Sequence, residues 1–314
     1  MPFSMNHSYG RLIAESLATR RPHTGKEFFV LGSAHANWEE LSEMFPTGPE
    51  GKTRVFTDLQ AAVDQTAASG DDVIFIAPGY TENITAAGDI DINNAHVTII
   101  GLGEGDQRPT FTFNTATTSD LNVDGAGITF ENIRFDLTGI DALTAPLDIN
   151  AASCVFRNCE FIVASATNQA LLAILTDANA DDLIIDKSVF RGTQTAGTTS
   201  AIRIVGSDNV TIKNSSFIGN YKASVGAIEV TTTAAGNLRI LNNTIVNTTA
   251  SSTAAMNFIK GTTAVVAGNT LGIKSSTSPV KVGEDQSTNQ GGGSVWTGNN
   301  YYKNTTNAVA GTLL

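Results

Sequence analysis

The sequence predicts an all-β protein: a single-stranded parallel β-helix of about eight to nine coils, with an N-terminal capping helix and an N-terminal arm. A nine-residue pattern recurs about eight times, and the distance from one copy to the next is between 26 and 31 residues. A third apolar run lies between successive copies. A fixed period in this range is typical of solenoids, because each repeat buries its apolar face against the next. The copies begin at His96, Gly127, Ser153, Asp182, Asn209, Asn237, Thr263 and Gly293.

Each copy is predicted to form a strand, a one-residue bend and a second strand. Apolar residues alternate in the first half, as at Val210 and Ile212, which places both on one face of a strand. A large apolar residue such as Phe217 then returns to the core. Asn and Gly tolerate a left-handed backbone, so the position between the two halves is predicted to be a sharp turn. In four copies this position holds Asn132, Asn158, Asn214 and Asn242, and in the last two it holds Gly268 and Gly298.

The third run, for example residues 201–205, completes a three-sided coil, because the repeat has no room for a crossover helix. Stacked strands lie about 4.8 Å apart, so eight coils would form a rod of about 40 Å. The alternative is an antiparallel sandwich of short strands. That alternative is weaker, since sandwiches do not keep one residue pattern in register over eight repeats.

An open first coil would expose strand edges and apolar side chains, so it needs a cover. A helix over residues 57–69 is predicted to supply it. Thr57 and Gln60 form a candidate capping box, and the apolar face holds Leu59, Ala62, Val63, Thr66 and Ala67. The predicted divisions are an arm over residues 1–50, the β-helix with its cap over 51–302 and a tail over 303–314.

The composition of the chain excludes several classes of function. The chain has 314 residues and a net charge of −11, so a broad nucleic-acid surface is not expected. No apolar run is long enough to cross a bilayer, and the first residues lack the apolar region of a secretory signal. The two cysteines, Cys154 and Cys159, are expected to be buried and reduced; a disulfide across Asn158 is the alternative.

The first 27 residues are net basic on an acidic chain. We expect them to form a docking arm that becomes ordered on a larger assembly, and the alternative is a loosely packed, solvated arm. A second short helix is expected over residues 37–45. The candidate attachment contacts are Arg11, Leu12, Ile13, Leu17, Arg20 and Arg21.

Residues 53–84 resemble the entry of the pectate-lyase-like β-helix superfamily, in which a helix, a strand and a Pro-Gly turn with Tyr and Glu follow one another. Residues 26–113 resemble a group of tailed-phage virion proteins through the segments 26–31, 45–46, 54–56, 97–103 and 108–111. These resemblances imply a right-handed β-helix. They also imply a head decoration or spike on the phage head surface, made in the host cytoplasm. The implied partners are the major capsid protein or another virion protein, with a homotrimer as the assembly.

Enzymes of this superfamily carry recognisable sets of carboxylates with His, Arg or Lys, and we find no such set, so no catalytic residue or cofactor is expected. Asp177, Asp181 and Asp182 are weak candidates for a Ca²⁺ site, and solvated turns are the alternative for them. The expected function is a non-enzymatic virion structural protein. A tailspike or receptor-binding protein that recognises or cleaves a cell-surface polysaccharide is the first alternative, and a secreted pectate-lyase-like enzyme is the second.

Overall fold

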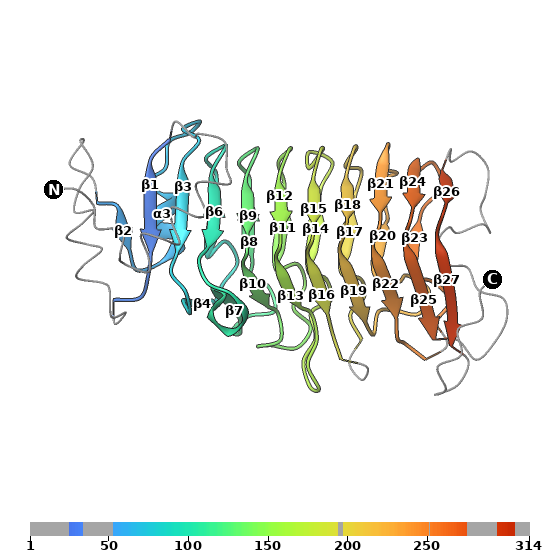
Figure 1. Ribbon diagram of the computed structural model, residues 1–314. Coiled ribbons are helices and arrows are strands. Elements are labelled where there is room, and N and C mark those ends of the chain that lie inside the picture. The colour runs from blue at the N-terminus through green and yellow to red at the C-terminus, as the bar shows by residue number, and fades with distance from the viewer. Residues whose placement is uncertain (1–24, 34–52, 194–196, 251, 275–293, 305–314) are drawn as a thin grey trace.

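The computed structural model describes residues 25–33, 53–193, 197–250, 252–274 and 294–304 (Figure 1). The six candidate attachment residues, the helix expected over residues 37–45 and most of the C-terminal tail lie outside these ranges. Within the described residues, no helix is both long enough and apolar enough to span a lipid bilayer.

Three parallel sheets form the walls of the molecule. Sheet A contains, in spatial order, β2 (Val55–Phe56), β1 (Glu27–Val30), β3 (Val73–Ile76), β6 (Thr98–Gly101), β9 (Thr129–Glu131), β12 (Val155–Arg157), β15 (Ile184–Asp186), β18 (Thr211–Lys213), β21 (Leu238–Leu241), β24 (Ala264–Ala267) and β26 (Val295–Thr297). Sheet B contains β4 (Thr81–Ile84), β7 (Thr110–Phe113), β10 (Arg134–Asp136), β13 (Glu160–Ile162), β16 (Val189–Arg191), β19 (Ser216–Gly219), β22 (Thr244–Asn247), β25 (Thr270–Lys274) and β27 (Asn300–Asn304). Sheet C contains β5 (Ile90–Ile92), β8 (Leu121–Val123), β11 (Leu147–Ile149), β14 (Ile174–Thr176), β17 (Ile202–Ile204), β20 (Ile228–Val230) and β23 (Met256–Phe258).

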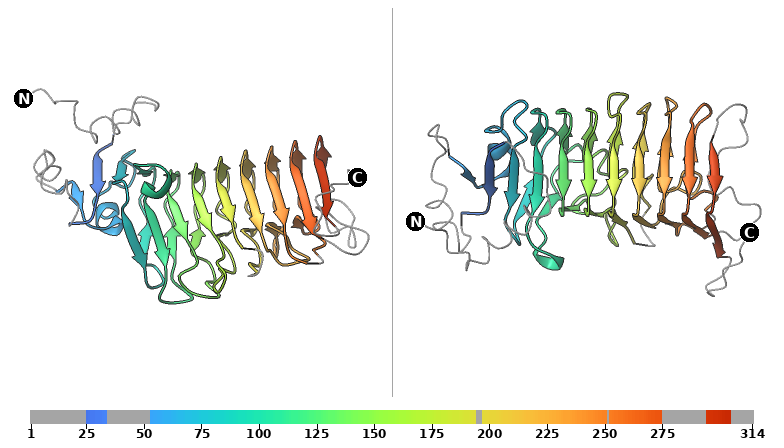
Figure 2. Two further views of the ribbon diagram at one scale, coloured as in Figure 1. Left: turned by 60° about the horizontal axis from the view of Figure 1, so that its bottom comes forward. Right: turned by 45° about the horizontal axis from the view of Figure 1, so that its top comes forward.

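Each coil gives one strand to sheet A, the next to sheet B and the third to sheet C. Seven coils contribute a described strand to all three sheets, and two more, β24–β25 and β26–β27, contribute to sheets A and B. The coils stack into an elongated rod whose two ends are the first and last coils (Figure 2). The predicted parallel β-helix of eight to nine coils is therefore confirmed.

The corner between sheets A and B is the predicted left-handed turn. The φ angles of Asn132, Asn158, Asn214 and Asn242 are 58°, 52°, 52° and 56°. Lys187 occupies the same position with a φ of 52°, although no propensity marks it as a turn residue. Stacking between coils supports the corner, since the side-chain amide of Asn158 donates to Oδ1 of Asn132 at 3.2 Å. At Lys187 the contact between coils is made by the backbone, since its N–H donates to the carbonyl oxygen of Lys213 at 3.2 Å.

Two internal ladders run along the rod. One is aromatic: the rings of Phe161, Phe190 and Phe217 stack with centroids 4.2 and 4.5 Å apart. The other is polar and lies just after the corner, where each backbone N–H donates to the side-chain oxygen of the next coil. Its described links join Cys159 to Ser188, Ser188 to Ser215, Ser215 to Asn243, Asn243 to Asn269 and Asn269 to Asn299. Buried polar groups therefore find partners in the adjacent coil.

Both cysteines are buried and free, so the alternative of a disulfide is excluded. Burial raises the pKa of the Cys154 thiol to about 11 and that of Cys159 to about 12. Since the thiolate is the reactive form, both residues act as small core side chains.

The capping helix forms, but it differs from the prediction in extent and in its cap. Helix α3 runs only from Leu59 to Val63, and Asp58 is its N-cap, accepting a hydrogen bond from the backbone N–H of Ala61. The predicted capping box of Thr57 and Gln60 is therefore wrong by one residue. Gln60 instead clamps the helix to β5, because its Oε1 accepts from the backbone N–H of Asp91 at 2.7 Å.

The Tyr and Glu of the Pro-Gly turn also hold the cap. Glu82 Oε2 accepts from the backbone N–H of Leu59 at 3.1 Å and from the hydroxyl of Tyr80 at 2.8 Å. The same hydroxyl lies 2.9 Å from the carbonyl oxygen of Thr57. This motif therefore joins the first coil to the helix that covers it, and its role here is structural.

Strand β1 lies inside the segment assigned to the arm, yet it is part of the rod. It pairs with β2 on one edge and with β3 on the other. Phe28 and Val30 enter the main core, whereas Phe29 and Leu31 join a second apolar cluster on the outer face of sheet A. The boundary after residue 50 stays a prediction for the remaining residues, but Glu27–Val30 belong to the β-helix.

Candidate functional site

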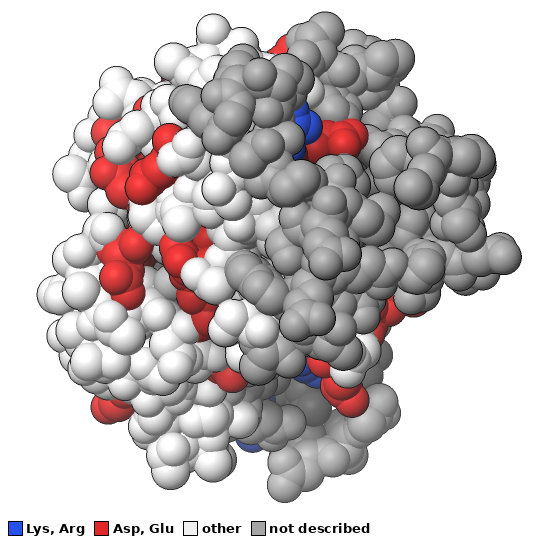
Figure 3. Space-filling model, turned by 90° about the vertical axis from the view of Figure 1, so that its left-hand side faces the viewer, with Lys and Arg blue, Asp and Glu red and all other residues white. Residues whose placement is uncertain are grey.

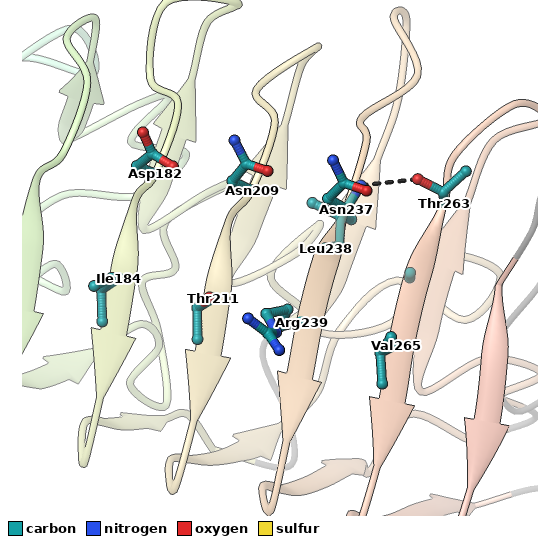
Figure 4. A pocket seen from close by; sticks show the side chains of 10 residues that line it. Asp182, Ile184, Asn209, Thr211, Asn237, Leu238, Arg239, Thr263 and Val265 are labelled. Carbon is teal, nitrogen blue, oxygen red and sulfur yellow. Dashed lines mark hydrogen bonds between the residues drawn. The ribbon is translucent and has the colours of Figure 1, made fainter.

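A shallow trough lies on the outer face of sheet A (Figure 4). Its volume is about 740 Å³, and it crosses four neighbouring strands, β15, β18, β21 and β24. Four strands at the usual spacing span about 14 Å along the rod. The lining residues are Asp182, Ile184, Asn209, Thr211, Asn237, Leu238, Arg239, Thr263, Ala264 and Val265.

The upper row of the trough sits at a second left-handed position, just before each strand of sheet A. Asp182, Asn209 and Asn237 have φ angles of 59°, 60° and 56°. Asp and Asn tolerate this conformation, which explains their presence at the first position of the repeat. Thr263 completes the row, and its Oγ1 accepts from the backbone N–H of Asn237 at 2.8 Å. The bends point these short polar side chains along one edge of the trough (Figure 4).

The lower row consists of outward-facing residues in exact strand register. Ile184 pairs with Thr211, Thr211 with Arg239, and Arg239 with Val265. Alternation along each strand sends the next residue into the core, so every strand contributes one side chain to this row. The result is a floor that mixes aliphatic groups, a hydroxyl and a guanidinium.

The polar groups of the trough are available to a ligand. Within the part of the chain that the structure describes, no hydrogen bond or ion pair occupies the side chains of Asp182, Asn209, Asn237, Thr211 or Arg239. Carboxylate, amide, hydroxyl and guanidinium groups together offer both donors and acceptors. Such a set, beside the exposed aliphatic side chain of Val265, suits a ligand rich in hydroxyl groups that also has apolar faces.

A second polar surface lies on the outer face of sheet C. Asp91, Asn122 and Asp148 point outward in register on β5, β8 and β11. Asp120 and Asp124 flank them, and the amide of Asn150 donates to Asp124 at 2.9 Å. Figure 3 shows that acidic side chains gather in groups on the described surface of the N-terminal end.

Two of these carboxyls, Asp148 and Asp120, have a raised pKa. Partial burial is the main cause that raises the pKa of Asp148, and its neighbours Asp120, Asp177 and Asp124 raise it further. The pKa of Asp120 is raised by burial and by Asp91. Burial also raises the pKa of Glu82 under the cap. Each of these groups therefore holds a proton more tightly in the folded chain than in the unfolded chain.

The raised pKa values predict how the stability of the fold changes with pH. An unfolded carboxyl has a pKa of about 4, so a group with a raised folded pKa stabilises the fold below that value and loses this contribution as pH rises through its folded pKa. We expect the melting temperature of the parent to fall more between about pH 4 and about pH 7.5 than that of Asp148→Asn, because the contribution of Asp148 is lost as pH rises above the unfolded pKa and through the folded pKa. Circular dichroism at a series of pH values measures it. The exposed Asp106→Asn serves as control and should follow the parent; identical pH profiles for parent and Asp148→Asn would contradict the assignment.

The structure separates the three candidate calcium ligands. Asp182 lines the trough, whereas Asp181 Oδ1 accepts from the backbone N–H of Asp208 at 2.6 Å. Asp177 accepts from the backbone and side-chain amides of Asn179, at 2.7 and 2.9 Å. Among the described residues, no group of three or more His, Cys, Asp or Glu side chains is arranged to hold a metal ion.

Sequence reasoning missed most of the trough. Its signal was present at the first position of the repeat, where His96, Gly127, Asp182, Asn209 and Asn237 all have positive φ. These residues mark where the copies begin, and each of them also forms a second left-handed bend in its coil. Arg239 and Thr211 carried no signal, because alternation alone does not say which outward residues are free of partners.

Distant structural matches to this chain include the following two. A rhamnogalacturonan lyase matches with a TM-score of 0.41 and 11% identity, covering 88% of this chain and 87% of that one. ORF18 of Geobacillus virus E2 matches with a TM-score of 0.20 and 12% identity, covering 78% of this chain and 56% of that one. No protein-family model and no curated protein sequence matches.

One expectation is corrected by this comparison. The sequence predicted a protein without enzymatic activity, but the first of the two structures is named as a polysaccharide lyase. The expectation of a non-enzymatic chain is therefore wrong in this respect and is not kept.

Proposed function

We propose that this protein is a surface protein of a phage virion whose β-helical rod binds a cell-surface polysaccharide in the sheet A trough. The observation that carries the proposal is the set of polar side chains without hydrogen-bond partners in the two rows of the open trough, above all Asn209 and Asn237 in the upper row and Arg239 in the lower row. Support for the virion setting comes from the resemblance of residues 26–113 to tailed-phage virion proteins.

The trough suits a saccharide chain lying along the rod. Amide and carboxylate groups form paired hydrogen bonds with neighbouring hydroxyls, and aliphatic groups such as Val265 pack against the apolar faces of sugar rings. Because the coils repeat at a constant spacing, the upper row presents the similar side chains of Asp182, Asn209 and Asn237 at equal intervals. A repeating polymer fits this arrangement better than a single small molecule does.

Attachment to the particle forms the second part of the proposal. The basic N-terminal segment would bind the major capsid protein or another virion protein, as a head decoration or spike. Single exposed charge contacts are weak, so many symmetry-related copies would share the attachment.

The binding test compares the parent with an Asn209→Ala, Asn237→Ala double variant. Each lost hydrogen bond removes about 0.5–1.5 kcal/mol, so the Kd should rise about 5- to 150-fold. Calorimetry with purified surface polysaccharides of candidate hosts measures it. Reducing-end and unsaturated-product assays on the same mixtures distinguish recognition from cleavage.

The matched control is Thr129→Ala, which removes a hydroxyl from the same outward row two strands before the trough. It should bind as the parent does. If the double variant and the parent bind with equal affinity, the polysaccharide binds outside the trough. If the parent binds none of the host polysaccharides, the proposed function is contradicted.

A further inference from the structure

The outer face of sheet A is apolar over its first four strands. One outward row crosses β2, β1, β3 and β6 in register, and each of its side chains is at most 5% exposed. The row consists of Val55, Phe29, Phe75 and Ile100. On the next strand, β9, the row becomes charged and holds Glu131. Parallel sheets are normally packed on both faces, so the apolar part of this face needs a partner.

Neither described helix packs on this outer face. The 3₁₀ turn η1 (Gly105–Gln107) buries no residue. Helix α3 packs on the opposite side of the sheet, because its buried residues belong to the main core. Those residues are Leu59, Ala62 and Val63. The partner of the apolar face is therefore a segment outside the described ranges or another molecule.

The connection between β1 and β2 is long enough to reach this face. The two strands are parallel and adjacent, so the chain has to return along the whole length of β1 before it enters β2. Such a crossover takes a dozen or more residues and usually contains a helix. The connection runs from Leu31 to Arg54, and residues 34–52 of it lie outside the described ranges.

The direction of this crossover determines the face on which it lies. In each coil the chain leaves sheet A, passes through sheets B and C on the inner side, and returns one strand closer to the C-terminal end. The step from β1 to β2 runs the opposite way, because β2 lies beyond β1 at the N-terminal edge (Figure 1). Nearly all crossovers between parallel strands are right-handed, and two crossovers of one hand that run in opposite directions lie on opposite faces of a sheet. The connection from β1 to β2 therefore belongs on the outer face.

The sequence of this connection offers a matching apolar surface. In the helix expected over residues 37–45, Trp38, Leu41 and Phe45 share one side. The opposite side holds Glu39, Glu40 and Glu43. We infer that residues 34–52 pack on the outer face of the first strands of sheet A, with Trp38, Leu41 and Phe45 against the apolar row.

Two other occupants of the face are less favourable. Residues 1–24 are joined to sheet A at one end only, and a second copy of the chain would lose translational and rotational freedom on binding. Residues 34–52 are joined at both ends to strands of this face, so the entropic cost of placing them there is small. Attachment to a particle is then left to the residues before β1, and sheet A is open to a ligand only from β9 onward. The inference does not depend on polysaccharide binding.

The fluorescence of Trp38 tests the inference in the full chain. The chain has two tryptophans, so Trp296→Phe leaves Trp38 as the one that remains. In the folded variant, Trp38 should emit at a shorter wavelength than in the urea-unfolded variant and be quenched less by acrylamide, because packing on the sheet withdraws the indole from water. Dilution should leave the emission unchanged, and so should the further substitutions Leu12→Ala, Ile13→Ala and Leu17→Ala. A solvent-exposed Trp38 in the folded chain would overturn the inference. Exposure of Trp38 on dilution, or after the three substitutions, would assign the face to a second copy or to residues 1–24.

A double-mutant cycle locates the contact. Leu41→Ala should lower the melting temperature of the parent by about 4–10 °C, as loss of a buried leucine does in a chain of this size. The matched control Glu40→Ala, on the opposite side of the helix, should lower it by less than about 2 °C. Combined with Phe75→Ala, Leu41→Ala should cost less than the sum of the two single effects, because residues in contact are coupled. Combined with Phe190→Ala, in the distant core stack, the effects should add. Additive effects in both pairs, or no effect of Leu41→Ala, would contradict the proposed packing.

Discussion

Replacing Phe190 by Ala is expected to lower the free energy of unfolding by about 3–5 kcal/mol. The Phe190 ring is fully buried between Phe161 and Phe217, with centroids 4.2 and 4.5 Å away. Its removal leaves a cavity and ends two stacking contacts, and the regular coils above and below resist collapse into the space. Urea unfolding followed by circular dichroism measures the change.

Val189→Ala is the matched control, because Val189 adjoins Phe190 on β16 but faces outward with 40% exposure. It should change the stability by less than about 0.5 kcal/mol, as surface substitutions usually do. Equal stability of Phe190→Ala and the parent would refute the assignment of this ring to the core stack.

A chain beginning at Gly51 is expected to lose at least about 6 kcal/mol of stability or to fail to fold, since it lacks four buried apolar residues worth about 1.5–3 kcal/mol each. Those residues are Phe28, Phe29, Val30 and Leu31, each no more than 3% exposed. The loss also frees an edge of β3 and uncovers Phe75, whose ring stacks on Phe29 at 5.6 Å. Thermal unfolding of the purified chains measures the effect.

A chain beginning at Gly25 is the control, because it keeps β1 and every described strand pair. Its melting temperature should equal that of the parent. It should nevertheless fail to bind virus particles that lack the native protein, because it lacks Arg11, Arg20 and Arg21. A stable chain from Gly51 would contradict the role of β1. If the chain beginning at Gly25 binds the particles as well as the full chain does, the attachment site lies on the β-helix and not on the N-terminal segment.

Local sequence patterns predicted the coils, because the strands and bends of a coil depend on residues that are close together in the chain. Alternation at Val210 and Ile212 places both residues in the core, and Asn214 adopts the left-handed bend that its residue type permits. The same reasoning misplaced the helix cap by one residue. Thr57 and Asp58 are both good caps, and contacts with Glu82 and Asp91 of the first coil decide between them.

The sequence by itself determined the repeat, the three strands of each coil, the Asn corners and the presence of a capping helix, because side-chain periodicity and backbone preference suffice for these features. Only the tertiary structure decided that β1 belongs to the rod, that Lys187 takes a left-handed bend, and that the outward residues from Asp182 to Val265 form a trough. These features depend on which residues lie beside one another in adjacent coils, about 26 to 31 positions apart in the chain. A repeat predicts that its coils stack, but the chemistry of each outer face depends on residues that the repeat leaves free to vary.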